Sequence, residues 1–239
     1  MEIYKVTIIL DSLADKSYTY TIINEIMHNL EKKYGYKFNE DILSKDQLNI
    51  QYCKRCFKCF ESLHCPFDGS DDMKYIKRGL LDADLIIFGL PVYMNNISGF
   101  SKNIIDRLSS WSHTNGLIGK KSIIVSTASH SGLLAVKKYM EAVCTAFGTE
   151  IIGEVFVTEN SSRKAGIVEE CVLKINAVLK GQANAVNSDL LDEHFTLLKK
   201  MTEEKQISFS EMEIKELTKR GFFLSNSFKE FKENAERSL

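Results

Sequence analysis

The sequence lacks several features that mark common classes of protein. It has no excess of charge, with 31 lysines and arginines against 32 aspartates and glutamates, so no global field favours nucleic acid or an anionic membrane. No apolar run approaches the roughly 20 residues of a membrane span, and the first residues have the pattern of a strand rather than a signal peptide. We therefore expect a cytoplasmic protein that binds neither nucleic acid nor membrane.

Two nucleotide-binding signatures are also missing. Neither Gly-x-Gly-x-x-Gly nor the Walker pattern occurs, so the sequence indicates neither a dinucleotide-binding turn of the usual kind nor a P-loop. Internal repeats and low-complexity tracts are absent as well. Apolar residues make up 44% of the 239-residue chain, which is an ordinary value for a globular protein and enough for a substantial core.

Cysteine is scarce outside one short stretch. Four of the six cysteines lie within residues 53–65, at Cys53, Cys56, Cys59 and Cys65. In a reducing compartment this crowding indicates metal or redox chemistry rather than disulfides. Three thiols at three-residue steps with a fourth nearby are typical of a cubane cluster, whereas structural zinc usually takes two Cys-x2-Cys pairs from separate knuckles. We interpret the run first as one 4Fe-4S site, with zinc or unliganded thiols as alternatives.

Strand-like and helix-like segments alternate over residues 1–185. Short apolar, β-branched runs predict strands at residues 3–10, 41–52, 84–91, 120–127 and 150–157. Helical periodicity between them predicts helices at residues 20–33, 70–82, 97–108, a segment ending near 147, and 168–185. This alternation predicts an α/β fold with a doubly wound, five-stranded parallel sheet.

Three polar loops would then share the carboxyl edge of the sheet, where open α/β sheets bind ligands. The first carries Ser12, Ser17, Tyr18 and Thr19 before a predicted helix. These are candidate phosphate ligands because a helix N-terminus favours an anion, although Ser17 or Thr19 could simply be an N-cap. The other two loops begin near residues 91 and 126.

The alternation stops after residue 185. Apolar residues at helical spacing and a Ser210-Glu-Met-Glu213 capping-box pattern predict a helical appendage over residues 186–239. Its leucines and phenylalanines would cover the parent domain or form a subunit contact.

These features in their order resemble the flavodoxin-like NAD(P)H-dependent FMN reductase family, and within it the iron-sulfur flavoproteins. The resemblance covers residues 3–180. It depends on the cysteine run, the following Asp71-Asp72-Met73, the segment Ala83 to Tyr93, and residues 98–107, which include Ser98-Gly99 and Asp106-Arg107.

The resemblance implies FMN as a cofactor beside the 4Fe-4S cluster. The loop with Ser12, Ser17, Tyr18 and Thr19 would bind its phosphate, and the other two loops would flank the isoalloxazine. The implied flanking residues are Pro91, Val92, Tyr93, Met94, Asn95, Asn96, Ser126, Thr127, Ala128, His130 and Gly132. The family generally begins its phosphate loop with Gly-Ser-Pro, whereas this chain has Leu10-Asp11-Ser12. An aspartate beside a phosphate is unfavourable unless it points away.

The expected function is electron transfer between a reduced donor, NAD(P)H or ferredoxin, and an unknown acceptor. The cofactors would perform the chemistry, so we assign no catalytic side chain. The resemblance also implies a homo-oligomer, dimer or tetramer. Two alternatives are a clusterless NAD(P)H-dependent FMN or quinone reductase and a non-enzymatic redox- or metal-sensing protein.

Overall fold

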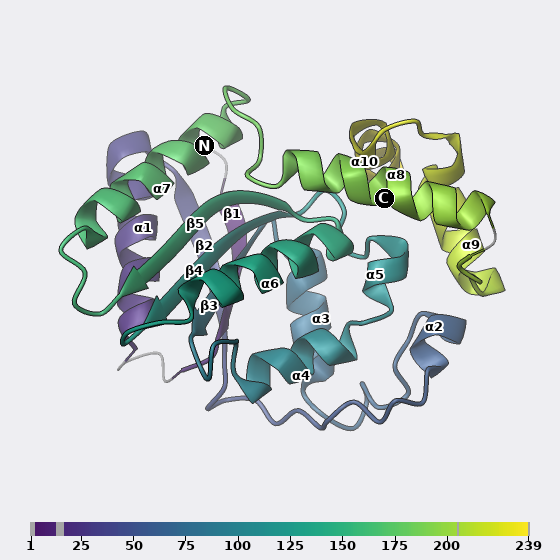
Figure 1. Cartoon of the computed structure of the whole chain (residues 1–239), viewed down its shortest axis with the longest axis horizontal. Helices are drawn as coiled ribbons and strands as arrows, with labels where there is room; N and C mark the ends of the chain where they lie inside the picture. Colours follow the sequence, from purple (N-terminus) through teal and green to yellow (C-terminus); the bar gives the residue numbers. More distant parts are fainter. Residues whose placement is uncertain (1–2, 13–16, 205, 239) are drawn as a thin grey trace.

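The computed structural model describes residues 3–12, 17–204 and 206–238. Its centre is a parallel sheet of five strands in the order β2-β1-β3-β4-β5 (Figure 1). The strands are β1 Ile3–Leu10, β2 Lys37–Ser44, β3 Leu85–Pro91, β4 Lys121–Ala128 and β5 Glu150–Thr158. This order is that of flavodoxin-like folds, so the predicted fold class is confirmed.

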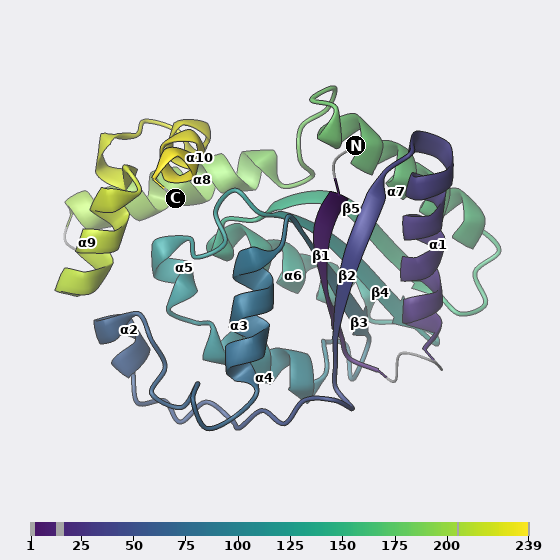
Figure 2. The same cartoon turned by 180° about the vertical axis from the view of Figure 1, so that it is seen from behind.

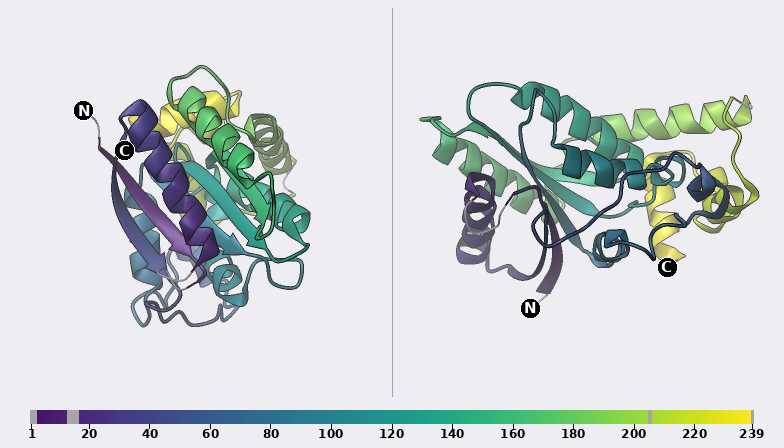
Figure 3. Two further views of the ribbon diagram at one scale, coloured as in Figure 1. Left: turned by 90° about the vertical axis from the view of Figure 1, so that its left-hand side faces the viewer. Right: turned by 90° about the horizontal axis from the view of Figure 1, so that it is seen from below.

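Helices cover both faces of the sheet. α1 (Tyr18–Tyr34) and α7 (Lys164–Leu179) lie side by side on one face (Figure 3). The other face carries α3 (Met73–Asp82), α4 (Gly99–Arg107), α5 (Trp111–Thr114) and α6 (Leu133–Phe147). Side chains of β3 alternate between the two resulting cores: Leu85 and Ile87 face α1 and α7, while Ile86 and Phe88 face the other layer. Burial on both faces explains why the strand is apolar throughout.

The predicted position of the second strand is wrong. The strand occupies Lys37–Ser44, and residues 45–52 already belong to the loop that follows. β2 lies at the edge of the sheet, and its residues 37, 39, 40 and 41 are exposed. A strand with so few buried residues has no apolar run, so the search for apolar runs missed it.

The chain beyond α7 forms a separate helical layer. It contains α8 (Ser188–Glu203), α9 (Glu211–Lys219), a 3-10 helix (Phe222–Leu224) and α10 (Phe228–Arg237). Its helices enclose their own apolar core, in which the rings of Phe195, Phe222 and Phe231 contact one another. Ile118, in the turn before β4, also belongs to this core. We call residues 186–239 the C-terminal extension; its separation from residues 1–185 as a domain remains a proposal.

No helix in the described part of the chain is long and apolar enough to cross a membrane.

Candidate functional site

The loops after β1, β3 and β4 meet at the carboxyl edge of the sheet. β1 and β3 are neighbours, and the chain turns to opposite sides of the sheet from these two strands, which makes this the topological switch point. Ligands of open α/β sheets bind at such a point. The structure therefore places the three predicted loops together.

The first loop brings two hydroxyls to the start of α1. The Ser12 hydroxyl donates to Ser17 Oγ at 2.6 Å, and Ser17 Oγ accepts from the backbone N–H of Tyr20 at 3.2 Å. Ser17 is thus the N-cap of a 17-residue helix. Hydroxyls and free N–H groups at a helix N-terminus suit a phosphate. The rest of the predicted loop, residues 13–16, lies outside the described residues.

Thr19 is less suited to contact a phosphate. Its side chain is buried, and its hydroxyl lies 2.6 Å from the hydroxyl of Thr127 at the end of β4. This one bond engages both hydroxyls, and it fastens α1 to the sheet between residues 108 positions apart in sequence. Tyr18, at the first position of α1, is half-buried.

Asp11 is directed away from the first loop. Its side chain is 1% exposed and lies by Ser98 and Ser101, at the start of α4. Burial raises the pKa of the carboxyl, and the Ser98 and Ser101 hydroxyls and the charge of Lys45 offset this only in part. Neither carboxylate oxygen has a hydrogen bond of ordinary geometry within the described chain. The departure from the family's Gly-Ser-Pro therefore puts no exposed charge beside the predicted phosphate position.

The second loop has an unusual backbone. Met94 and Asn95 both have positive φ, at 47° and 59°, and the backbone N–H and C=O groups of Tyr93 and Asn96 pair across them. Two consecutive left-handed residues are typical of a type I′ turn, which normally takes glycine or asparagine. Met94 is 98% exposed. A strained turn that presents an apolar side chain to solvent is a feature of binding sites.

The third loop contacts the second at Gly132. This residue has φ of 96°, and a Cβ there would lie 2.6 Å from Val92 Cγ1 and 2.9 Å from Asn95 Oδ1. Glycine is therefore required for both conformation and space. Ser126, Thr127 and Ala128, which were expected in this loop, are the last three residues of β4 and are buried, whereas His130 is exposed. Of the predicted residues of this loop, His130 and Gly132 are the ones that lie at the surface.

The cysteine run lies in a loop along the same edge of the molecule, between β2 and α3 (Figure 2). It contains one short helix, α2 (Lys58–Ser62), which has no buried residue. Arg55, Phe57 and Leu63 all have positive φ. Such conformations are costly for bulky residues and cluster at functional sites. We call residues 53–65 the cysteine loop.

The four thiols of this loop are free and reach the surface. Cys56 is exposed, and Cys53, Cys59 and Cys65 are half-buried. Burial raises the pKa of Cys59, the neighbouring thiols of Cys65 and Cys53 raise it further, and a Ser110 hydrogen bond and Lys77 oppose the increase. The thiols of Cys53 and Cys65 are thus near enough to Cys59 to raise its pKa.

The donor set fits an iron-sulfur cluster, which is held by cysteine thiolates. Within residues 3–12, 17–204 and 206–238, however, no three His, Cys, Asp or Glu side chains lie close enough together to hold a metal ion. Binding a cluster would therefore require the cysteine loop to bring its thiols closer together.

A buried ion pair anchors both ends of the cysteine loop. Arg107, on α4, contacts Asp71 at 2.5 Å, and both side chains are 1% exposed. The guanidinium also donates to the carbonyl of Gln51 at 2.9 Å and to Asp68 at 3.0 Å. Burial disfavours the charge on Asp71, but hydrogen bonds from Arg107, Gln51 and Met73 hold the pKa of this carboxyl below its ordinary value.

Asp106 and Arg107 are the last two residues of α4. The structure separates their roles: Asp106 pairs with Lys102 on the exposed side of α4, while Arg107 points inward. Both belong to the segment that carried the family resemblance, but one sequence could not reveal which of the two is buried.

A cavity of about 650 Å³ opens between the cysteine loop and α4. Cys53 and Cys59 line it together with Tyr52, Phe57 and Phe60. Asn103 forms its wall, accepting from the Cys53 N–H at 3.3 Å and donating to the carbonyl of Gln51 at 3.2 Å. The cavity therefore gives a ligand of moderate size access to two of the candidate cluster thiols.

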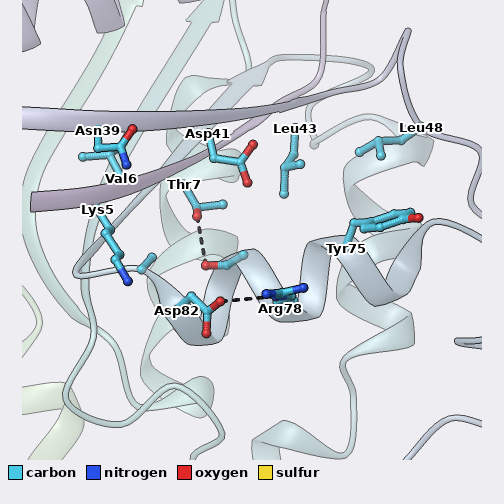
Figure 4. Close-up of a pocket in the computed structure, with 12 residues that line it drawn as sticks. Lys5, Val6, Thr7, Asn39, Asp41, Leu43, Leu48, Tyr75, Arg78 and Asp82 are labelled. Carbon is cyan, nitrogen blue, oxygen red and sulfur yellow. Dashed lines mark hydrogen bonds and ion pairs between the residues drawn. The ribbon is translucent and has the colours of Figure 1, made fainter.

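A second cavity, of about 390 Å³, lies between α3 and the strands β1 and β2 (Figure 4). Lys5, Asp41 and Arg78 line it, and Arg78 forms an ion pair with Asp82 at 3.5 Å. It contains none of the predicted site residues.

Comparison with known proteins identifies the family of the chain. Residues 4–163 match the sequence model of the NADPH-dependent FMN reductase family. The chain belongs to this family. An iron-sulfur flavoprotein of Archaeoglobus fulgidus is 31% identical over 120 residues, which are 50% of this chain and 53% of the relative. One of Methanocaldococcus jannaschii is 29% identical over 89 residues, 37% of this chain and 43% of the relative. This family member thus spans about half the length of the curated relatives it matches, or less.

Solved structures share the fold of this FMN reductase family member at low identity. An NADH:FMN oxidoreductase aligns with a TM-score of 0.51 and 16% identity over 75% of this chain and 90% of the other. An oxidoreductase from Corynebacterium diphtheriae has a TM-score of 0.54 and 13% identity over 76% of this chain and 99% of the other. The family is that of NADPH-dependent FMN reductases, and it is matched over residues 4–163.

Proposed function

We propose that the protein is an iron-sulfur flavoprotein, in which FMN bound at the carboxyl edge of the sheet exchanges electrons with a 4Fe-4S cluster in the cysteine loop. The observation that carries this proposal is the set of four free thiols in one loop beside the flavin edge, in a chain of this family. The names of the relatives support it.

The bound cofactors would supply the redox chemistry, because FMN takes up two electrons and releases them singly while a cluster carries one. The protein's part is to bind and orient them. Ser12 and Ser17 would bind the phosphate, and residues 91–96 with His130 and Gly132 would flank the ring. Cys53, Cys56, Cys59 and Cys65 would bind the cluster. NADPH, NADH or ferredoxin would donate electrons, and the assembly would be a dimer or tetramer.

The spread of the thiols and the open position of Cys56 favour a second candidate, a clusterless NAD(P)H-dependent FMN reductase acting on a quinone or another small oxidant. In that case the cavity beside Cys53 and Cys59 would receive the oxidant. Both candidates bind FMN, but only the first also binds iron.

Anaerobic reconstitution distinguishes them. We expect about four irons and four sulfides per chain, together with flavin bands near about 370 and 450 nm and a shoulder near about 400 nm. Cys56→Ser should lower the iron content, whereas the matched control Cys144→Ser, at a buried thiol outside the loop, should leave it unchanged. Bound FMN without iron would favour the clusterless reductase. One tightly held zinc would contradict the assignment of the four thiols to a 4Fe-4S cluster.

A further inference from the structure

The C-terminal extension contacts the cysteine loop directly. α9 packs against both α2 and α5, and Figures 1 and 2 show α2 lying beneath α9 at the end of the molecule remote from α1. The residues that match the family end at residue 163, so this contact is made by a part of the chain beyond the shared region.

Three contacts form the junction, one hydrogen bond and two contacts between rings. The Ser210 hydroxyl donates to the carbonyl of Phe60 at 2.7 Å, which fastens the residue next to Cys59. The ring of His113, on α5, lies against Phe60 with centroids 4.6 Å apart. On its other side the His113 ring meets Phe209 of the extension at 5.6 Å, in an edge-to-face arrangement. His113 is therefore held between the cysteine loop and the extension.

Glu213 completes the junction from within α9. It is 1% exposed, and its Oε1 lies 2.9 Å from Nδ1 of His113. Its Oε2 accepts from the backbone N–H of Ser210 at 2.8 Å, while Ser210 Oγ accepts from the Glu213 N–H at 3.2 Å. This capping box fixes Ser210, and so the bond to Phe60 depends on the same buried carboxylate that holds His113.

The cysteine loop needs such support. α2 buries none of its own residues, and an isolated helix of five residues is unstable in water. The Arg107 ion pair anchors the two ends of the loop at Gln51 and Asp68, but it does not reach α2. Cys59 lies on α2 beside the Ser110 hydroxyl, next to the helix that carries His113.

We propose that His113, Ser210 and Glu213 are positioning residues that hold α2, and with it Cys59, against α5 and the C-terminal extension. The extension thereby controls how firmly the cysteine loop retains its cluster, while FMN binding, which uses none of these residues, is unaffected. The control of cluster retention rests on the proposed function; the holding of α2 does not.

The first test needs no metal. In the apo protein, His113→Ala should increase the rate at which iodoacetamide alkylates Cys59 by about fivefold to tenfold, because local opening exposes this half-buried thiol. Alkylation of Cys56, which is already exposed, should not change. His113→Asn, whose amide can still donate to Glu213, should restore part of the protection. Unchanged labelling of Cys59 in His113→Ala would overturn the proposal, whatever metal the protein holds.

The second test measures retention. In reconstituted protein, Phe60→Ala and His113→Ala should release iron to a chelator about tenfold faster than wild type, with unchanged FMN content. Tyr75→Ala is the matched control, because this ring lies on α3, outside the cysteine loop, and is 52% exposed. If wild type binds no iron while Cys59 still becomes more reactive in His113→Ala, the cluster proposal fails and the positioning role stands. Equal loss of iron and FMN would indicate a general loss of structure and contradict a local role.

Discussion

Arg107 and Asp71 form an ion pair of 2.5 Å in which both side chains are 1% exposed. The pair connects α4 to the segment before α3, and through the Gln51 carbonyl it reaches the start of the cysteine loop. Breaking a buried pair by removing one partner leaves an uncompensated charge, which costs about 3–5 kcal/mol.

Arg107→Ala should therefore lower the free energy of unfolding by about 3–5 kcal/mol, as measured by urea denaturation. The neighbouring change Asp106→Ala breaks an ion pair with Lys102 in which both side chains are 45% exposed, and exposed pairs contribute about 1 kcal/mol or less. An Arg107→Ala protein as stable as Asp106→Ala would show that the buried pair does not hold the loop.

Asp11 should make the apo protein less stable as the pH rises. Burial raises its pKa in the folded state above 3.8, so the folded protein binds this proton more tightly than the unfolded chain does. The resulting loss in the free energy of unfolding is absent below pH 3.8, the pKa of the unfolded chain. It grows as the pH rises from 3.8 to the raised pKa of the folded state and is complete above that pKa. Asp11→Asn should thus stabilise the protein at pH 7, and the gain should shrink as the pH falls.

The check on Asp11 is urea denaturation of wild type and Asp11→Asn across this range, with Asp41→Asn as the exposed control. If the difference in stability between wild type and Asp11→Asn did not vary with pH, or if Asp11→Asn were less stable at pH 7, Asp11 would not be a buried carboxylate of raised pKa.

The six thiols should differ in reactivity. Burial raises the pKa of Cys144 and of Cys171 to about 12, so both should resist alkylation in the folded apo protein. Cys56 is exposed and should react first, as mass spectrometry after timed iodoacetamide treatment can show. All six should react in urea. Labelling of Cys144 before Cys56 would mean that the cysteine loop is more enclosed than the structure shows.

FMN binding should depend on Ser17. A negative charge at the N-cap of α1 would repel the phosphate, so Ser17→Asp should weaken FMN by at least ~1.4 kcal/mol, which is tenfold in Kd. Asn24→Asp adds the same charge further along α1, at an exposed position, and should have little effect. Fluorescence titration of the apo protein measures both. Equal FMN affinities of Ser17→Asp and Asn24→Asp would show that this loop does not bind the phosphate.

Asn187 should couple the start of the C-terminal extension to the sheet. Its buried amide accepts from the Ile151 N–H at 2.8 Å and donates to the Thr149 carbonyl at 3.0 Å. Asn187→Ala leaves these groups unpaired and should cost about 1–3 kcal/mol of stability. Asn184→Ala, at an exposed position of the same connection, is the control. Two equal thermal midpoints would show that the extension is attached by other contacts.

The sequence by itself determined the alternation of strands and helices and the spacing of the cysteines. Both are local properties: the buried strands β1, β3, β4 and β5 are apolar runs because helices cover both faces. The same reasoning missed β2, because an exposed edge strand has no such run. The capping box at Ser210 was also visible, since its two partners lie three residues apart.

Only the tertiary structure decided which side chains meet across the fold. Thr19 bonds Thr127, Arg107 bonds Asp71, and Glu213 holds His113. These partners are 108, 36 and 100 positions apart in sequence. The local sequence around one residue of such a pair does not indicate which residue is its partner. The order of the strands and the packing of the helices bring them together, because burial of apolar faces sets the distances at which polar groups must then find partners.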